Sequence, residues 1–231
     1  MSISTPLTKK KVSDHLTYSL WKYVILCAAA FLFWELFYTQ TAYRVPQEKR
    51  VDVYIKSGTT SQEIADAFLE PIWKDSVPEM ELVSSTLLSA ADDSTAVMQL
   101  AVWVAAGEGD IYILPLSDFK SYASSGAFLS LEEYVDSGVL HTEGIDLSSG
   151  KVQTYLGTDE KGNDAYEEEP RLYGIPMDSL YGYMEGMSLD NRGMVMAVLT
   201  ANKNTDNVIT FMDALIQAGR GEAPSWLLET E

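Results

Sequence analysis

The stretch AVMQLAVWVAAGEGDIYIL, residues 96–114, decides the fold of this chain. Its first part carries apolar residues at helical spacing and predicts a helix. The residues predicted to line the buried face of that helix are Val97, Leu100, Ala101 and Val104. Gly107 and Gly109 end the helix. Asp110–Leu114 then forms a short, nearly continuous apolar run, which is typical of a strand in the middle of a parallel sheet.

Two more strand and helix units precede this stretch. Val51–Ile55 alternates apolar and polar residues and predicts a strand, and the capping box Thr60–Glu63 predicts the start of the helix that follows. Met80–Leu88 predicts a second strand, and Asp92 and Asp93 predict the cap of the next helix. Strand and helix therefore alternate three times. This order predicts an α/β fold, a parallel-sheet lobe with helices on both faces.

The composition excludes several classes of function. The chain has 231 residues and a formal net charge of −18, and the part after Tyr43 carries about −20, which repels nucleic acid and anionic headgroups. After Tyr43 there is no cysteine and one histidine, His141. Neither a paired nucleophile and base nor a zinc site of cysteines and histidines can be assembled there. We therefore expect no enzyme activity, no catalytic residues, no metal and no cofactor.

A second stretch, WKYVILCAAAFLFWELFYTQTAY at residues 21–43, predicts one membrane-spanning helix. Between Lys22 and Arg44 it carries a single charge, Glu35, and it has the ~20 residues that a span needs. Its strongly apolar side chains contribute about −2.4 to −4.8 kcal/mol, against about 2.5 to 3.5 for an acidic group at mid-helix. Insertion is favourable because Glu35 lies off centre, in the last third of the span.

The flanking charges predict the orientation of this span. Four lysines in the first 22 residues place the N-terminus in the cytoplasm and the main domain outside the cell membrane. One competing interpretation is a signal peptide cleaved after Ala28–Ala30, but the apolar run continues past that site. Another is a lipoprotein at Cys27, but Leu26 is bulky where a small residue should precede the cysteine. We favour an uncleaved signal anchor.

The predicted organisation follows from these segments. It consists of a cytoplasmic tail (1–20), a transmembrane signal anchor (21–43), a tether (44–49), an α/β domain (50–219) and a C-terminal tail (220–231). Within the domain, residues 140–170 break the strand and helix pattern and predict an exposed hairpin insertion with a turn at Gly157–Asn163.

Four segments in this order resemble the extracellular solute-binding proteins of ABC importers, most of all the sugar-binding families. Ala96–Val135 is similar to their helix, glycine corner and buried strand, and Arg171–Asp178, RLYGIPMD, is similar to their YGIP strand. Met194–Thr200 and the helical pattern Asn204–Ala218 resemble the strand and helix that complete the first lobe. The resemblance implies a lobe like that of type II periplasmic-binding proteins, which binds a small solute or sugar for an ABC permease.

The chain departs from this family in one large feature. Only Ser179–Gly193 separates the YGIP strand from the returning strand, where the family builds a second lobe. The resemblance therefore implies a protein reduced to one lobe. A single lobe cannot close on a ligand and expel water, so we expect it to bind a small solute weakly.

Ligands in parallel α/β sheets bind at the carboxyl ends of the strands. The residues predicted to bind a ligand there are Ser57, Gly58, Thr59, Ser117, Asp178 and Ser179, and Ser84–Thr86 of the second strand is a further polar segment expected at that edge. Tyr173, Tyr181 and Tyr183 predict either an exposed patch for a protein partner or the edge of the core. Two functions stay open: solute binding for an ABC permease, or recruitment of another membrane protein.

Overall fold

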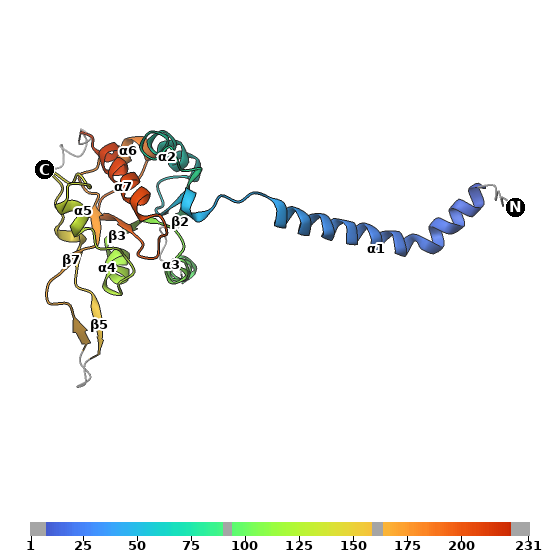
Figure 1. Cartoon of the computed structure of the whole chain (residues 1–231), viewed down its shortest axis with the longest axis horizontal. Helices are drawn as coiled ribbons and strands as arrows, with labels where there is room; N and C mark the ends of the chain where they lie inside the picture. Colours follow the sequence, from blue (N-terminus) through green and yellow to red (C-terminus); the bar gives the residue numbers. More distant parts are fainter. Residues whose placement is uncertain (1–7, 90–93, 159–163, 223–231) are drawn as a thin grey trace. The chain divides into compact units, whose positions relative to one another are not determined.

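The computed structural model describes residues 8–89, 94–158 and 164–222, which fall into two units, Met1–Arg44 and Val45–Glu231 (Figure 1). The first unit contains α1 (Lys9–Thr41), whose Leu20–Thr41 portion has 22 residues and a mean hydropathy of 1.6. This length and composition suit a membrane span or a signal sequence. The predicted caps Asp92 and Asp93, the hairpin tip 159–163 and the outermost parts of both predicted tails lie outside the described residues.

The second unit is built on a five-stranded sheet with the order β2-β1-β3-β9-β8. Its strands are β1 (Arg50–Lys56), β2 (Leu82–Leu88), β3 (Ile111–Pro115), β8 (Gly174–Pro176) and β9 (Met194–Val198). β1 pairs in parallel with β2 and β3, whereas β9 pairs antiparallel with both β3 and β8. The predicted α/β class is confirmed. The sheet is mixed and not wholly parallel, because β8 ends and β9 begins at the same edge.

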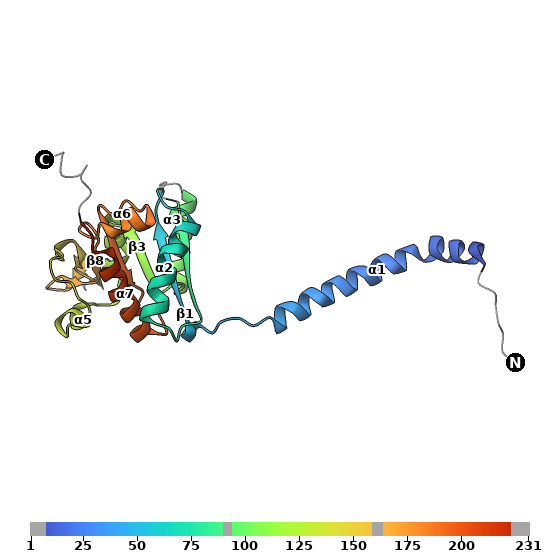
Figure 2. The ribbon, with the colours of Figure 1, turned by 90° about the horizontal axis from the view of Figure 1, so that it is seen from above.

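Helices cover both faces of this sheet (Figure 2). They are α2 (Gln62–Ser76), α3 (Ser94–Ala106), α4 (Leu116–Ser124), α5 (Glu132–Asp136), α6 (Gly182–Met187) and α7 (Thr205–Gly219). α2, α6 and α7 pack together and bury the larger core cluster against one face, whereas α3 and α4 bury the smaller cluster against the other.

The alternation of side chains along each strand divides the core between the two faces. In β3, Ile111 and Ile113 enter the larger cluster, whereas Tyr112 and Leu114 enter the smaller one. All four are fully buried, as the continuous apolar run predicts for a strand covered on both sides.

The region after α5 forms the irregular part of the domain. Its described residues contain one short helical turn, η2 (Ser148–Gly150), and two strand pairs. β4 (Lys151–Val152) pairs with β7 (Arg171–Leu172), and β5 (Tyr155–Thr158) pairs with β6 (Asp164–Tyr166). A further turn, η1 (Gln47–Lys49), precedes β1. β5 and β6 form an antiparallel hairpin within residues 140–170, and Figure 1 shows it projecting from the sheet.

Two local predictions differ from the structure. The N-cap of α2 is Ser61, whose hydroxyl accepts a hydrogen bond from the Ile64 amide at 3.4 Å, and not Thr60. α3 buries Leu100 but leaves Val97 and Ala101 exposed. The second difference has a simple physical reason: α3 is apolar on all sides, so spacing alone cannot select its buried face.

Candidate ligand-binding edge of the sheet

Three loops and the first turn of α4 meet at the edge of the sheet where β1, β3 and β8 end and β9 begins. The loops are 57–61, 177–181 and 188–193, and α4 begins at Leu116 directly after β3. Backbone hydrogen bonds join them, since the Leu116 amide donates to the Gly193 carbonyl at 2.8 Å and the Met177 amide donates to the Met194 carbonyl at 2.9 Å. The antiparallel direction of β9 is what brings the last of these loops to the carboxyl ends of the other strands.

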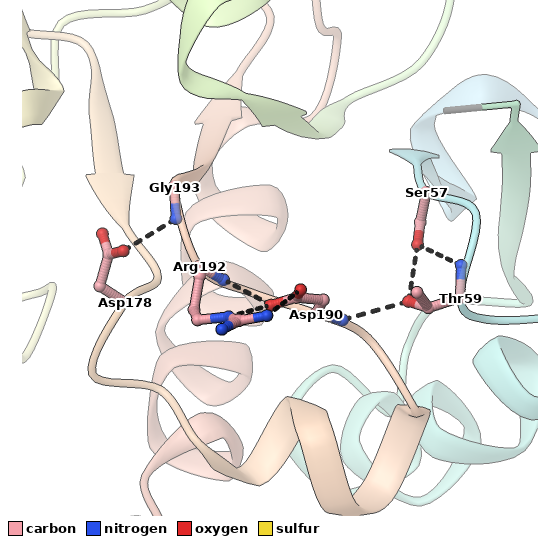
Figure 3. Close-up of polar contacts among 6 residues, drawn as sticks. All are labelled: Ser57, Thr59, Asp178, Asp190, Arg192 and Gly193. Carbon is pink, nitrogen blue, oxygen red and sulfur yellow. Dashed lines mark hydrogen bonds and ion pairs between the residues drawn. The ribbon is translucent and has the colours of Figure 1, made fainter. Parts of the chain in front are cut away.

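A chain of polar contacts runs across the edge (Figure 3). The Thr59 amide donates to the Ser57 hydroxyl at 3.1 Å, and the two hydroxyl oxygens lie 3.2 Å apart. The Thr59 hydroxyl in turn accepts the Asp190 amide at 3.1 Å. The loop after β1 is therefore fixed to the loop before β9 through a residue that the strand-end rule predicts.

Asp190 and Arg192 form a bidentate ion pair at the centre of Figure 3. Arg192 Nε donates to Asp190 Oδ1 at 2.8 Å, and its Nη2 donates to Oδ2 at 2.7 Å. The side-chain hydrogen bond from Arg192 lowers the pKa of Asp190 below its ordinary value. Both side chains are exposed, so this pair orients polar groups at the surface and contributes little to stability.

Two further contacts hold the segment before β9 in place. Asp178 Oδ1 accepts the Gly193 amide at 2.8 Å. Asn191 is fully buried and its Nδ2 donates to the Met177 carbonyl and, at 3.1 Å, to the Leu180 carbonyl. Its Oδ1 finds no hydrogen-bond partner among the described residues. These contacts hold the segment before β9 against the end of β8 and thereby fix the backbone that carries Asp190 and Arg192.

A buried ion pair marks the end of β1. Lys56 Nζ lies 2.8 Å from Asp118 Oδ2, with the lysine side chain 2% exposed and the aspartate 24% exposed. Asp118 belongs to the first turn of α4, where a carboxylate also interacts favourably with the helix dipole. The neighbouring Ser117 is exposed on the same turn.

A shallow hollow of about 250 Å³ lies beside these groups. The residues that line it are Thr59, Met184, Ser188, Leu189, Asp190 and Arg192. It offers hydroxyl, carboxylate and guanidinium groups beside the apolar side chain of Met184, whereas Leu189 is 1% exposed. The volume falls just below the ~300–1,000 Å³ of ordinary ligand pockets. Among the described residues, no group of three or more histidines, cysteines and acids is placed to hold a metal ion.

The structure brings most of the predicted ligand-binding residues to one edge. Ser57, Gly58 and Thr59 share the loop after β1, and Asp178 follows β8 beside Ser179, which is half-buried. The predicted polar segment Ser84–Thr86 differs, because β2 continues to Leu88 and these residues lie in the middle of the strand.

The three tyrosines predicted as a possible partner patch do not form one surface. Tyr173 is 7% exposed and packs in the smaller core cluster, whereas Tyr183 is fully buried in the larger cluster on the opposite face of the sheet. The Tyr183 hydroxyl donates to the Leu215 carbonyl at 3.0 Å, and burial raises the pKa of that hydroxyl. Of the three, Tyr181 is half-exposed. The alternative prediction, that these residues belong to the core, agrees with the burial of Tyr173 and Tyr183.

Sequence reasoning missed Asp190, Arg192 and Lys56. The first two lie in the short segment Ser179–Gly193 between the YGIP strand and the returning strand, and the strand-end rule for parallel sheets does not reach the start of an antiparallel strand. Lys56 directly follows the predicted strand Val51–Ile55, where a charged residue is usually exposed, so the sequence gave no signal of its burial beside Asp118.

A second polar hollow, of about 280 Å³, lies at the opposite edge of the sheet, where β1 and β3 begin. Asp52 and Asp110 meet there: the Asp52 amide donates to Asp110 Oδ2 at 2.8 Å, and Arg50 Nη2 lies 2.6 Å from Asp52 Oδ2. Burial raises the pKa of Asp110 to about 6, and the nearby Asp52 carboxylate adds to the rise, whereas the Asp52 amide and Arg50 oppose it.

The comparisons with known proteins concern the fold. No protein-family model and no curated protein matches the chain. Similar solved structures include a family 1 extracellular solute-binding protein from Alicyclobacillus acidocaldarius, with 18% identity over 58% of this chain and 28% of that chain, and a TM-score of 0.38. The N-glycan transport solute-binding protein NgtS from Streptococcus pneumoniae shows 17% identity over 55% of this chain and 24% of its own, with a TM-score of 0.35.

A third similar structure is the binding protein AttC of Agrobacterium tumefaciens in an open, unliganded conformation. It shows 12% identity over 74% of this chain and 81% of its own, with a TM-score of 0.40. The chain thus spans about a quarter of the length of the first two structures. The names of the first two structures contain the words solute-binding protein.

Proposed function

We propose that this chain is a membrane-anchored, extracytoplasmic solute-binding-like module without catalytic activity. In this proposal the carboxyl edge of the sheet binds a small polar solute, such as a carbohydrate, and the module serves an ABC permease. The observation that carries the proposal is the convergence of Ser57, Thr59, Asp178, Asp190 and Arg192 on one edge beside a hollow.

The chemistry of the edge suits a solute with many hydroxyl groups. Carboxylate oxygens accept hydrogen bonds, the Arg192 guanidinium donates them, and the Thr59 hydroxyl can do both. Met184 adds apolar surface to the hollow, which fits the less polar face of a sugar ring. Polar groups that fix orientation around an apolar floor are the usual design of a small-molecule site.

The same geometry limits the affinity. The hollow is open and the described residues supply one wall, so a bound solute keeps much of its contact with water. Water competes for each hydrogen bond in such a site. We therefore expect dissociation constants in the millimolar range, or about −4 kcal/mol of binding free energy.

Thermal unfolding of the full chain in detergent micelles tests this function, with a panel of mono- and oligosaccharides as probes. A solute at ten times its dissociation constant should stabilise the domain by about 1.4 kcal/mol and raise the melting temperature accordingly. Arg192→Ala and Thr59→Ala, which both remove a side chain that lines the hollow, should abolish the shift. The matched control is Asp206→Ala, an exposed acid in the first turn of α7, near the edge where β1 begins.

The competing function is an interaction module that recruits a membrane protein and binds no small solute. The small volume and open shape of the hollow are the observation that supports this alternative. In that case no sugar shifts the melting temperature of the parent chain, and cross-linking in native membranes recovers one specific partner. A shift that survives in both edge variants would also contradict solute binding at this edge.

A further inference from the structure

The outward face of α3 is apolar, although the helix lies on the surface of a strongly acidic domain. Val97 is 47% exposed, Met98 66% and Val102 58%. Ala101 and Ala105 are exposed between them. A surface helix normally gives this face to charged and polar residues. The exposed side chains of Val97, Met98, Ala101, Val102 and Ala105 are called the α3 face below.

α3 also has a buried face, on the side of the helix opposite the α3 face. Ala96 and Leu100 on the opposite face are 6% and 2% exposed, and Leu100 belongs to the smaller core cluster. Trp103, half-buried on that side, meets Tyr54 of β1 edge to face with ring centroids 4.8 Å apart. α3 therefore has one apolar face covered by the sheet and a second that no described residue covers. Contiguous exposed apolar surface of this kind marks interaction sites.

The distribution of charge indicates which partner suits the α3 face. No charged residue occurs from Ser94 to Gly107, whereas the chain as a whole has a net charge of −18. Two copies that met through acidic surface would repel each other. Two copies that meet through α3 bring neutral, apolar surfaces together. An anionic bilayer suits the face poorly, because helices that lie on membranes carry lysine and arginine along their polar side, and α3 has none.

The spacing of side chains on the α3 face also fits a second helix of the same kind. Val97, Ala101 and Ala105 follow one another at four-residue intervals and form a ridge of low height. Ridges of this type interdigitate when two helices cross at about −50°, with axes ~8–10 Å apart. In a twofold pair the same patch serves both copies, so Ala101 at the centre of the face would lie near the axis.

We propose that the α3 face is the surface through which two copies of this chain associate. The exposed area of five small and medium side chains is well below the ~800 Å² per partner of a stable interface, so the association is weak in dilute solution. This step rests on the proposed membrane anchor: confinement to one membrane raises the effective concentration of the copies and makes a weak contact sufficient.

Cysteine cross-linking of the full chain tests the proposal directly. Cys27 is the single cysteine, so a Cys27→Ser background leaves the chain free of thiols. Ala101→Cys in this background, oxidised in native membranes, should yield a covalent product of twice the chain mass. Lys120→Cys, at an exposed position of α4, is the matched control and should yield at least tenfold less.

A second substitution separates a true interface from random collision. Val102→Lys in the Ala101→Cys chain places a charge on the α3 face at a 58% exposed position, so the melting temperature should stay unchanged while the covalent dimer falls at least tenfold. Equal dimer from the Ala101 and Lys120 positions, or no dimer from either, overturns the proposal.

Two other occupants of the face would give their own signals. A product of a different mass from the Ala101 position would identify another protein on this face and overturn self-association. Quenching of a fluorophore at position 101 by brominated lipids, without dimer, would identify the bilayer and overturn it as well.

Discussion

The carboxyl group of Asp110 couples the stability of the domain to pH. It lies at the start of β3, where its Oδ2 accepts the Asp52 amide and where burial raises its pKa to about 6. The folded state therefore holds this proton more tightly than the unfolded chain, in which the pKa is near 4. The stability that protonated Asp110 contributes is fully present below pH 4 and is lost as pH rises through 6.

Asp110→Asn should remove this dependence, because an amide accepts the Asp52 hydrogen bond without ionising. We expect the stability of Asp110→Asn relative to the parent chain to rise by about 2 kcal/mol between pH 4 and pH 7, after allowance for partial exposure to water. Urea unfolding of the full chain at intervals of one pH unit measures it. Asp206→Asn, an exposed acid, serves as control, and a difference that stays constant with pH would contradict the assignment to Asp110.

At the scale of single residues, the sequence predicted the candidate edge in part. Ser57, Thr59 and Asp178 followed from the rule that ligands bind at strand ends, which depends only on where an apolar run stops. Asp190 and Arg192 could not be predicted, because their position depends on the direction of β9. An apolar run such as Met194–Val198 predicts a buried strand but does not show whether that strand is parallel or antiparallel to its neighbours.

At the scale of elements, Gly174 shows why the YGIP segment carries glycine. A Cβ on Gly174, at the start of β8, would lie 2.7 Å from Phe119 Cε2 of α4 and would also collide with Val195 of β9. Phe119 stacks on Phe128 at a centroid distance of 5.7 Å and is fully buried. Gly174 thus lets α4 approach the sheet and sets the position of the first turn of α4, which bears Ser117.

Gly174→Ala should therefore destabilise the domain by overpacking, at a cost of about 1–3 kcal/mol. The melting temperature of the full chain measures this cost. Gly138→Ala makes a fitting control, because a Cβ there meets no atom within 4 Å and pays only for the positive φ of 75°. Gly174 is not among the glycines with positive φ, so its loss would come from the contacts with Phe119 and Val195 alone, and an unchanged melting temperature in Gly174→Ala would contradict this close approach.

The pattern of elements was more predictable than their faces. The alternation of strands and helices followed from apolar periodicity and glycine corners, and it yielded the α/β class that the structure has. The exposed face of α3 did not follow, since a helix without charged residues has no polar side to orient it. The antiparallel direction of β9 depends on tertiary structure, because the chain re-enters the sheet at the edge where β8 ends. Local sequence does not encode this direction.

At the scale of the whole molecule, the proposals depend on where the domain is held. A weak solute site serves a permease, and a weak α3 contact forms dimers, only if the domain is confined near one membrane surface. Leu20–Thr41 has the length and hydropathy for a span, and the four lysines before residue 23 predict a cytoplasmic N-terminus.

Thiol labelling in intact cells tests this topology. In the Cys27→Ser background, Lys120→Cys should react with a membrane-impermeant maleimide in intact cells, whereas Ser13→Cys should react only after the cells are permeabilised. The reason is that the positive-inside rule places Ser13 with the lysines and Lys120 across the bilayer. The reverse labelling pattern would show that the N-terminus lies outside the cell and the domain lies in the cytoplasm. Recovery of a mature chain that begins after Ala30 would show that the apolar helix is a cleaved signal peptide and not an anchor. The copies would then not be confined to one membrane, and the proposed weak dimer would not form.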